Sequence, residues 1–152
     1  VSPSFDCTGL YGTLCGASAL NAGVTPEWRH KLRIGWNSPG GIGLSAQWRY
    51  FSAVKIDLSS PQAQLAGAFS PFNGRIPAQS YFDLTFTARL GDHYDFRLGV
   101  NNLFDRPPPI IGANGTTNVV NACVATFCSG NTFPNVYDAL GRYLFAGVTL
   151  NF

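Results

Sequence analysis

Charge is scarce in this chain. Only 12% of its 152 residues are Asp, Glu, Lys or Arg, against roughly 25% in soluble globular domains. Methionine is absent, and no apolar run reaches the length of about 18 residues that a transmembrane helix needs. The net charge of +2 is too small to indicate a nucleic-acid partner. Residues 1–6 lack a basic start and an apolar core, so they are not a signal peptide.

Aromatic and glycine residues are frequent instead. Aromatics make up 14% of the chain and glycines number 17, which suits a β structure with one face in lipid. Five segments alternate apolar with polar side chains, and this period of two predicts strands because successive side chains point to opposite faces. In the last segment, Leu144, Val148 and Leu150 share one face, and Thr149 and Asn151 share the other. We predict strands at about 27–37, 42–55, 80–90, 93–103 and 141–152.

The connections between these strands alternate in length. Long loops are expected at 1–25, 56–79 and 105–140, and tight turns at 38–41 and 91–92. Outer-membrane barrels have this alternation, with short periplasmic turns and longer extracellular loops. Aromatic residues also lie near the strand ends, where a membrane barrel has its aromatic girdles: Trp28, Trp36, Trp48, Tyr50, Tyr81, Tyr94 and Phe152. A soluble sandwich would alternate too, but its outward face would carry many more charges.

The pattern therefore predicts an all-β fold, an antiparallel transmembrane β-barrel segment. Five strands cannot close a bacterial barrel, which needs an even number from eight upward, and open edges are not tolerated in lipid. We expect residues 1–152 to be the C-terminal part of a larger barrel, with the rest of that barrel and outer-membrane lipid as its partners.

Eight charged residues occupy the polar face of the predicted strands. An Arg or Lys on the lipid face would cost about 2–4 kcal/mol at the midplane, so we expect all eight to face the barrel lumen. One interpretation is that they pair with one another and with other protein in the lumen. The other is a cationic wall that draws anionic substrates inward. These lumen-facing candidates are Arg29, Lys31, Arg33, Arg49, Asp83, Arg89, Asp95 and Arg97.

Four cysteines allow three disulfide pairings. The two local pairings, Cys7–Cys15 and Cys123–Cys128, fit best because each lies within one predicted loop. Disulfides indicate an oxidising compartment outside the cytosol. No Cys-x-x-Cys spacing suggests zinc, and no cluster of residues suggests catalysis. We expect no enzyme activity, no metal and no cofactor.

One motif resembles a known family. The run Asn101-Asn102-Leu103-Phe104-Asp105 precedes a basic residue and prolines. It is followed by a loop, by residues 137–143 (Tyr-Asp-Ala-Leu-Gly-Arg-Tyr), and by a strand that ends in Phe152. This combination resembles the C-terminus of TonB-dependent outer-membrane receptors, and the resemblance covers about residues 25–152.

The resemblance implies a 22-stranded barrel with a plugged lumen in the outer membrane of a Gram-negative bacterium. It implies energy-coupled import of a small-molecule substrate, a scarce nutrient such as a ferric siderophore. The plug domain and the segment that binds the TonB energy-coupling protein would belong to sequence outside this chain. Phe152 would be an assembly signal that the barrel assembly machinery reads on the last strand. The alternative is a structural or enzymatic outer-membrane barrel, of adhesin or phospholipase type, without energy coupling.

Overall fold

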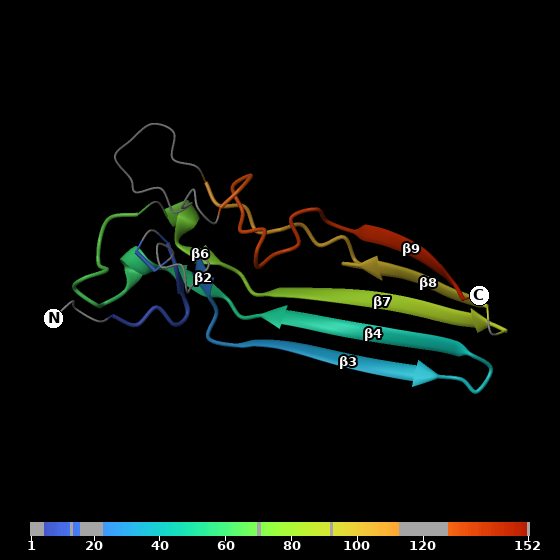
Figure 1. The fold of residues 1–152 in the computed structure, drawn as a ribbon. Coiled ribbons are helices and arrows are strands. Elements are labelled where there is room, and N and C mark those ends of the chain that lie inside the picture. The colour runs from blue at the N-terminus through green and yellow to red at the C-terminus, as the bar shows by residue number, and fades with distance from the viewer. Residues whose placement is uncertain are drawn as a thin grey trace. The chain divides into compact units, whose positions relative to one another are not determined.

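The computed structural model describes residues 5–12, 14–15, 23–69, 71–91, 93–112 and 128–151. Strands dominate it, with two short 3₁₀ helices (Figure 1). The chain divides into two compact units. The first, which we call the loop unit, is drawn from Val1–Arg29, Phe51–Gln79 and Pro107–Ala139. The second, which we call the sheet unit, is drawn from His30–Tyr50, Ser80–Arg106 and Leu140–Phe152.

Five strands form one sheet in the order β3-β4-β7-β8-β9, and neighbouring strands run in opposite directions (Figure 1). Their bounds are β3 Arg29–Asn37, β4 Ile42–Phe51, β7 Gln79–Leu90, β8 Tyr94–Asn101 and β9 Tyr143–Leu150. Each coincides with a predicted strand, although four are shorter than predicted. The two edges, β3 and β9, do not pair with each other, so the described residues form an open sheet and no closed barrel.

The register gives the sheet one apolar and one polar face. Phe86 lies opposite Leu98, which lies opposite Ala146. One residue along, Thr87 lies opposite Arg97. Ring contacts extend the apolar face to the other strands, because His30 of β3 contacts Trp48 of β4, and Trp48 stacks on Phe82 of β7. The alternation predicted from the sequence is therefore present across all five strands.

The apolar face is uncovered. Ile34 is 67% exposed, Leu98 52% and Leu144 72%. Five strands about 4.8 Å apart and about 27 Å long give the face an area of roughly 650 Å². That exceeds the few hundred Å² of contiguous apolar surface that monomeric soluble proteins show. A soluble antiparallel sheet would bury one face, so this sheet requires an apolar partner.

The loop unit contains a second, smaller sheet. Its strands are β1 Leu10–Tyr11, β2 Val24–Thr25, β5 Val54–Ile56 and β6 Arg75–Ile76, in the order β2-β1-β5-β6, with β1 and β5 parallel. Two 3₁₀ turns, η1 Asp57–Ser59 and η2 Pro71–Asn73, accompany them. The sequence predicted only loops at 1–25 and 56–79, and this was wrong. Strands of two or three residues are too short to show a period of two.

A packed core holds the loop unit together. Tyr11, Ile56, Ile76, Phe133 and Tyr137 are all buried. The predicted strand at 42–55 is interrupted, because β4 ends at Phe51 and the chain leaves the large sheet there. Just after this point the N–H of Ser52 donates to the carbonyl of Trp28 at 2.9 Å. Residues 54–56 then pair with β1 and β6. Apolar burial, rather than the cysteines alone, therefore orders the described parts of these loops.

Candidate functional site

The Asn101–Asp105 motif folds into a closed turn at the end of β8. Asn102 has a left-handed backbone (φ 54°) and only 1% of its surface is exposed. Its side-chain Nδ2 donates to the carbonyl of Arg106 at 2.8 Å, and the N–H of Arg106 donates back to Oδ1 at 2.8 Å. Asn tolerates this backbone region better than most residues. The motif therefore ends the strand and fixes the path of the chain after it.

Asp83 of β7 joins this turn to the neighbouring strands. Its carboxylate accepts from Arg49 twice, from Nε at 2.8 Å and from Nη2 at 2.9 Å. Gln47 Nε2 donates to it at 3.0 Å, and so does the backbone N–H of Asn102. The guanidinium of Arg49 also lies over the Tyr81 ring, 5.1 Å from its centroid. One largely buried carboxylate thus connects β4, β7 and the motif.

The other motif residues connect the turn to β9 and β7. Asn101 pairs with Tyr143 in the ladder. The N–H of Leu103 donates to the carbonyl of Phe82 at 2.7 Å, and the Phe104 ring meets the Phe82 ring edge-on at 5.5 Å.

Asp105 fixes the start of β9. Its Oδ1 accepts from the N–H of Arg142 at 2.8 Å. Gly141 has φ +71°, and a Cβ there would lie 2.9 Å from the same oxygen. The structure thus brings all five motif residues together as a clamp between three strands. The side chains of Asn102, Phe104 and Asp105 make these contacts, whereas Asn101 and Leu103 contribute backbone pairing.

The eight charged residues form two groups. Arg49 pairs with Asp83, and Arg89 Nε donates to Asp95 at 2.8 Å in a more exposed pair. Among the residues that the structure describes, the other four form no ion pair. Arg33 Nε donates to Ser45 Oγ at 3.2 Å instead. The polar face therefore contains internal pairs and also four positive charges without an acidic partner in the described chain: Arg29, Lys31, Arg33 and Arg97.

An aromatic side chain shapes the middle of the polar face. Phe145 of β9 lies opposite Gly99 of β8, and a methyl group at Gly99 would overlap its ring. The guanidinium of Arg97 lies 5.3 Å from the centroid of the same ring. Because Gly99 has no side chain, Phe145 can lie flat on the sheet and support the arginine.

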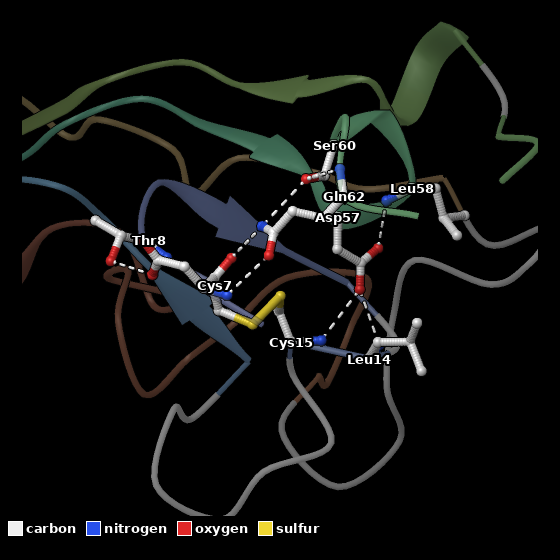
Figure 2. The surroundings of a disulfide bond; sticks show 9 residues. Cys7, Thr8, Leu14, Cys15, Asp57, Leu58, Ser60 and Gln62 are labelled. Carbon is white, nitrogen blue, oxygen red and sulfur yellow. Dashed lines mark hydrogen bonds between the residues drawn. A yellow bond between two sulfur atoms is a disulfide. The ribbon is translucent and has the colours of Figure 1, made fainter. Parts of the chain in front are cut away.

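The predicted disulfide Cys7–Cys15 is present in the loop unit, next to a buried carboxylate (Figure 2). Asp57 has no exposed surface. Its Oδ2 accepts from the N–H groups of Leu14 at 2.8 Å and Cys15 at 3.1 Å, and its Oδ1 accepts from that of Leu58 at 2.8 Å. Three donors compensate the charge, which would otherwise be costly to bury. The disulfide therefore helps to hold the two donors of the cysteine loop around Asp57.

Tyr11 lies in the same core. Its hydroxyl donates to the carbonyl of Asn73. Burial, with a smaller contribution from the negative charge of Asp57, raises the pKa of Tyr11 to about 12. Cys128 is also disulfide-bonded, while its expected partner Cys123, like Phe152, lies outside the described residues.

Metal ligands do not gather in the described chain. Within it, no three His, Cys, Asp or Glu residues come together in a way that could hold a metal ion. His30 packs against Trp48 and Tyr50, and His93 lies 3.0 Å from the carbonyl of Asn151. These contacts bring no nucleophilic side chain beside either histidine.

The sequence analysis did not identify two residues of the buried hydrogen-bond networks, Gln47 and Asp57. Asp83 was expected on the polar face, but Gln47 was not singled out as its partner. Asp57 was not noticed, because a single Asp in a loop is normally solvated and two of its three donors, Leu14 and Cys15, lie more than 40 positions earlier in the chain. No sequence pattern of short range could have identified that contact.

Comparisons with protein-family descriptions, with curated proteins and with solved structures find no match for this chain. No helix in the described part of the chain has the length and apolarity needed to cross a membrane.

Proposed function

We propose that this chain is the C-terminal part of the barrel of a TonB-dependent outer-membrane receptor, which imports a scarce nutrient such as a ferric siderophore. The observation that carries the proposal is the uncovered apolar face of a regular five-stranded sheet. Lipid hydrocarbon can cover the whole area of such a face. Closed antiparallel sheets are one of the two structures that cross bilayers. Further strands of the same barrel would satisfy the edges β3 and β9.

The dimensions of the apolar face fit a bilayer. Phe82 and Leu90 mark its two ends on β7. The eight steps along the strand from Phe82 to Leu90, at about 3.4 Å each, span about 27 Å, and a strand tilt of about 40° reduces this to roughly 20 Å of membrane thickness. An outer-membrane barrel has an apolar band of about 25 Å.

Aromatic residues occur at both ends of this face. At the end nearer the motif, the rings of His30, Trp48, Phe82 and Phe104 contact one another in sequence from β3 to the residues after β8. At the end nearer the tight turns, Trp36 is 59% exposed, and Tyr94 stacks on Phe96. Aromatic rows at both ends of an apolar face are typical of membrane-interface girdles.

The polar face supports the transport part of the proposal. In a closed barrel it would line the lumen, and its four positive charges without acidic partners would attract an anionic substrate. The folded motif adds support, since the residues that resemble the receptor family form one connected clamp. An adhesin or phospholipase barrel would share the apolar face, but nothing in the described residues favours either over the receptor.

Cysteine labelling tests the two faces. Leu98→Cys and Arg97→Cys are neighbours on β8, and the described chain has no free cysteine to interfere. In outer membranes, a water-soluble thiol reagent should label position 97 and a lipid-soluble reagent position 98. Equal labelling of both positions by the water-soluble reagent would contradict a membrane-spanning sheet.

A transport assay tests the function itself. A strain that lacks the gene should lose uptake of at least one radiolabelled ferric siderophore under iron limitation. A plasmid copy should restore it only when the TonB protein is present. Uptake that survives loss of TonB, or the absence of any uptake defect across a panel of ferric siderophores, would argue for a barrel without energy coupling.

A further inference from the structure

The outward face of the small sheet in the loop unit carries a polar pocket that the transport proposal does not use. The register places Leu10, Lys55 and Arg75 in one row on β1, β5 and β6. Their neighbours along the strands point the other way, into the core. These three residues line the pocket together with Asp6, Glu27 and Ser59.

Lys55 and Arg75 lie directly opposite each other in this row. Like charges in directly opposite positions destabilise an antiparallel pair. Both side chains are exposed, and neither forms an ion pair with any residue that the structure describes. Their charges are therefore left for a ligand to compensate.

The chemistry of the pair favours an oxyanion. Neighbouring strands are about 4.8 Å apart, so an ammonium and a guanidinium can reach the same bound group. Arginine binds two oxygens of a carboxylate or phosphate at once, and lysine adds a third donor. Two carboxylates also line the pocket: Glu27, which lies against Gly9, and Asp6, which accepts from the N–H and the hydroxyl of Thr8. Neither forms an ion pair with Lys55 or Arg75 in the described chain, so a ligand would bind with its negative group at the two cations of β5 and β6.

The pocket is held open by the chain around the disulfide. The N–H of Asp6 donates to Gln62 Oε1 at 3.0 Å, and Gln62 Nε2 donates back to the carbonyl of Asp6 at 2.8 Å. Gln62 Nε2 also contacts Ser60 Oγ at 3.3 Å, and Figure 2 shows both residues beside Cys7. These bonds fix one wall of the pocket, which lowers the ordering cost of binding.

We propose that this pocket binds a small ligand through a carboxylate or phosphate group held between Lys55 and Arg75. The inference stands on the loop unit alone and does not rest on the transport function. If the pocket binds no oxyanion, the receptor proposal is unaffected.

Titration calorimetry of the purified full-length protein tests it, with inorganic phosphate and citrate as probes at constant ionic strength. The wild type should bind at least one of them saturably. Lys55→Ala/Arg75→Ala should weaken binding about tenfold or more, since two charge-assisted contacts are removed. Lys55→Arg should retain binding, because the charge and a donor remain.

Arg142→Ala is the matched control, because it removes an exposed cation of the sheet unit that is not one of the charged residues expected in the lumen. Circular dichroism checks that each variant is folded; both substituted side chains are exposed, so folding should be unaffected. Saturable binding that is lost only in the double variant supports the site, and the probe that binds identifies the oxyanion. No saturable binding of either probe, an equal loss in Arg142→Ala, or a loss in Lys55→Arg as large as in the double variant would overturn it.

Discussion

Replacing Asp83 by Asn keeps the shape of the side chain and removes its charge. In the wild type, Arg49 donates to both carboxylate oxygens, and only 17% of the Arg49 side chain and 9% of the Asp83 side chain are exposed. An amide has one acceptor oxygen, so Asp83→Asn places an NH₂ group against one of the guanidinium donors. Arg49 is then left largely buried with its charge uncompensated.

The size of the effect follows from this geometry. A hydrogen bond to a charged group contributes about 1.5–3 kcal/mol, and breaking a fully buried ion pair costs about 3–5 kcal/mol. The Arg49–Asp83 pair is largely but not fully buried, and Gln47 and Asn102 still have one oxygen to share. We therefore expect Asp83→Asn to lower the free energy of unfolding by about 2–3 kcal/mol.

The assay is urea unfolding of the full-length protein in lipid vesicles, followed by tryptophan fluorescence. Asp95→Asn is the matched control, because it removes a carboxylate from a more exposed ion pair on the same face. Exposed pairs contribute little, so the control should unfold close to the wild type. Arg49→Gln/Asp83→Asn should lose less than the sum of the single variants. The reasoning is refuted if Asp83→Asn is no less stable than Asp95→Asn.

Three other predictions concern Gly99, Tyr11 and Phe152. Gly99→Ala should lower the midpoint of urea unfolding because its methyl group overlaps the Phe145 ring, whereas Gly147→Ala should not, since nothing lies within 4 Å of its added Cβ; equal midpoints would contradict this. Because the fold raises the pKa of Tyr11 to about 12, above its ordinary value near 10, the associated stability should be complete below pH 10 and lost as pH rises to 12. Tyr11→Phe should flatten that part of the pH profile of thermal unfolding, and an unchanged profile would mean that Tyr11 does not cause it. Deleting Phe152 should reduce the amount of assembled barrel in outer membranes while the ligand affinity of the surviving molecules stays the same; unchanged assembly would rule out its role as a signal.

The strands of the large sheet could be predicted because the alternation that identifies each strand lies within a few consecutive residues. Residues 82–90 of β7 alternate between apolar and polar side chains, and the tight turns after β3 and β7 make β3–β4 and β7–β8 neighbours. The register, which was not predicted, keeps like faces together, since Phe86 lies opposite Leu98 and Arg89 opposite Asp95. The loop unit could not be predicted this way, because β1 pairs with β5, more than 40 positions later.

The motif shows the same division between local and distant information. The Asn102–Arg106 bonds join residues four positions apart, yet the strand predicted at 93–103 ran through Asn102 and Leu103, whereas β8 ends at Asn101. The contact of Asp83 with Asn102 joins residues 19 positions apart. It becomes predictable only once β7 and β8 are known to be paired, because Leu84 then lies opposite Val100 and places Asp83 beside the turn.

Two kinds of partner can cover the apolar face: a second layer of protein, or lipid. A second protein layer would have to match the aromatic row of His30, Trp48 and Phe82 with specific packing. Lipid requires only that polar groups be absent between the two aromatic rows, and between Phe82 and Leu90 the outward side chains of β7 are Leu84, Phe86 and Ala88. The polar face has the opposite character, with internal ion pairs and positive charges that require water or an anion. The proposed barrel wall would meet both conditions, with lipid on its apolar face and the lumen on its polar face.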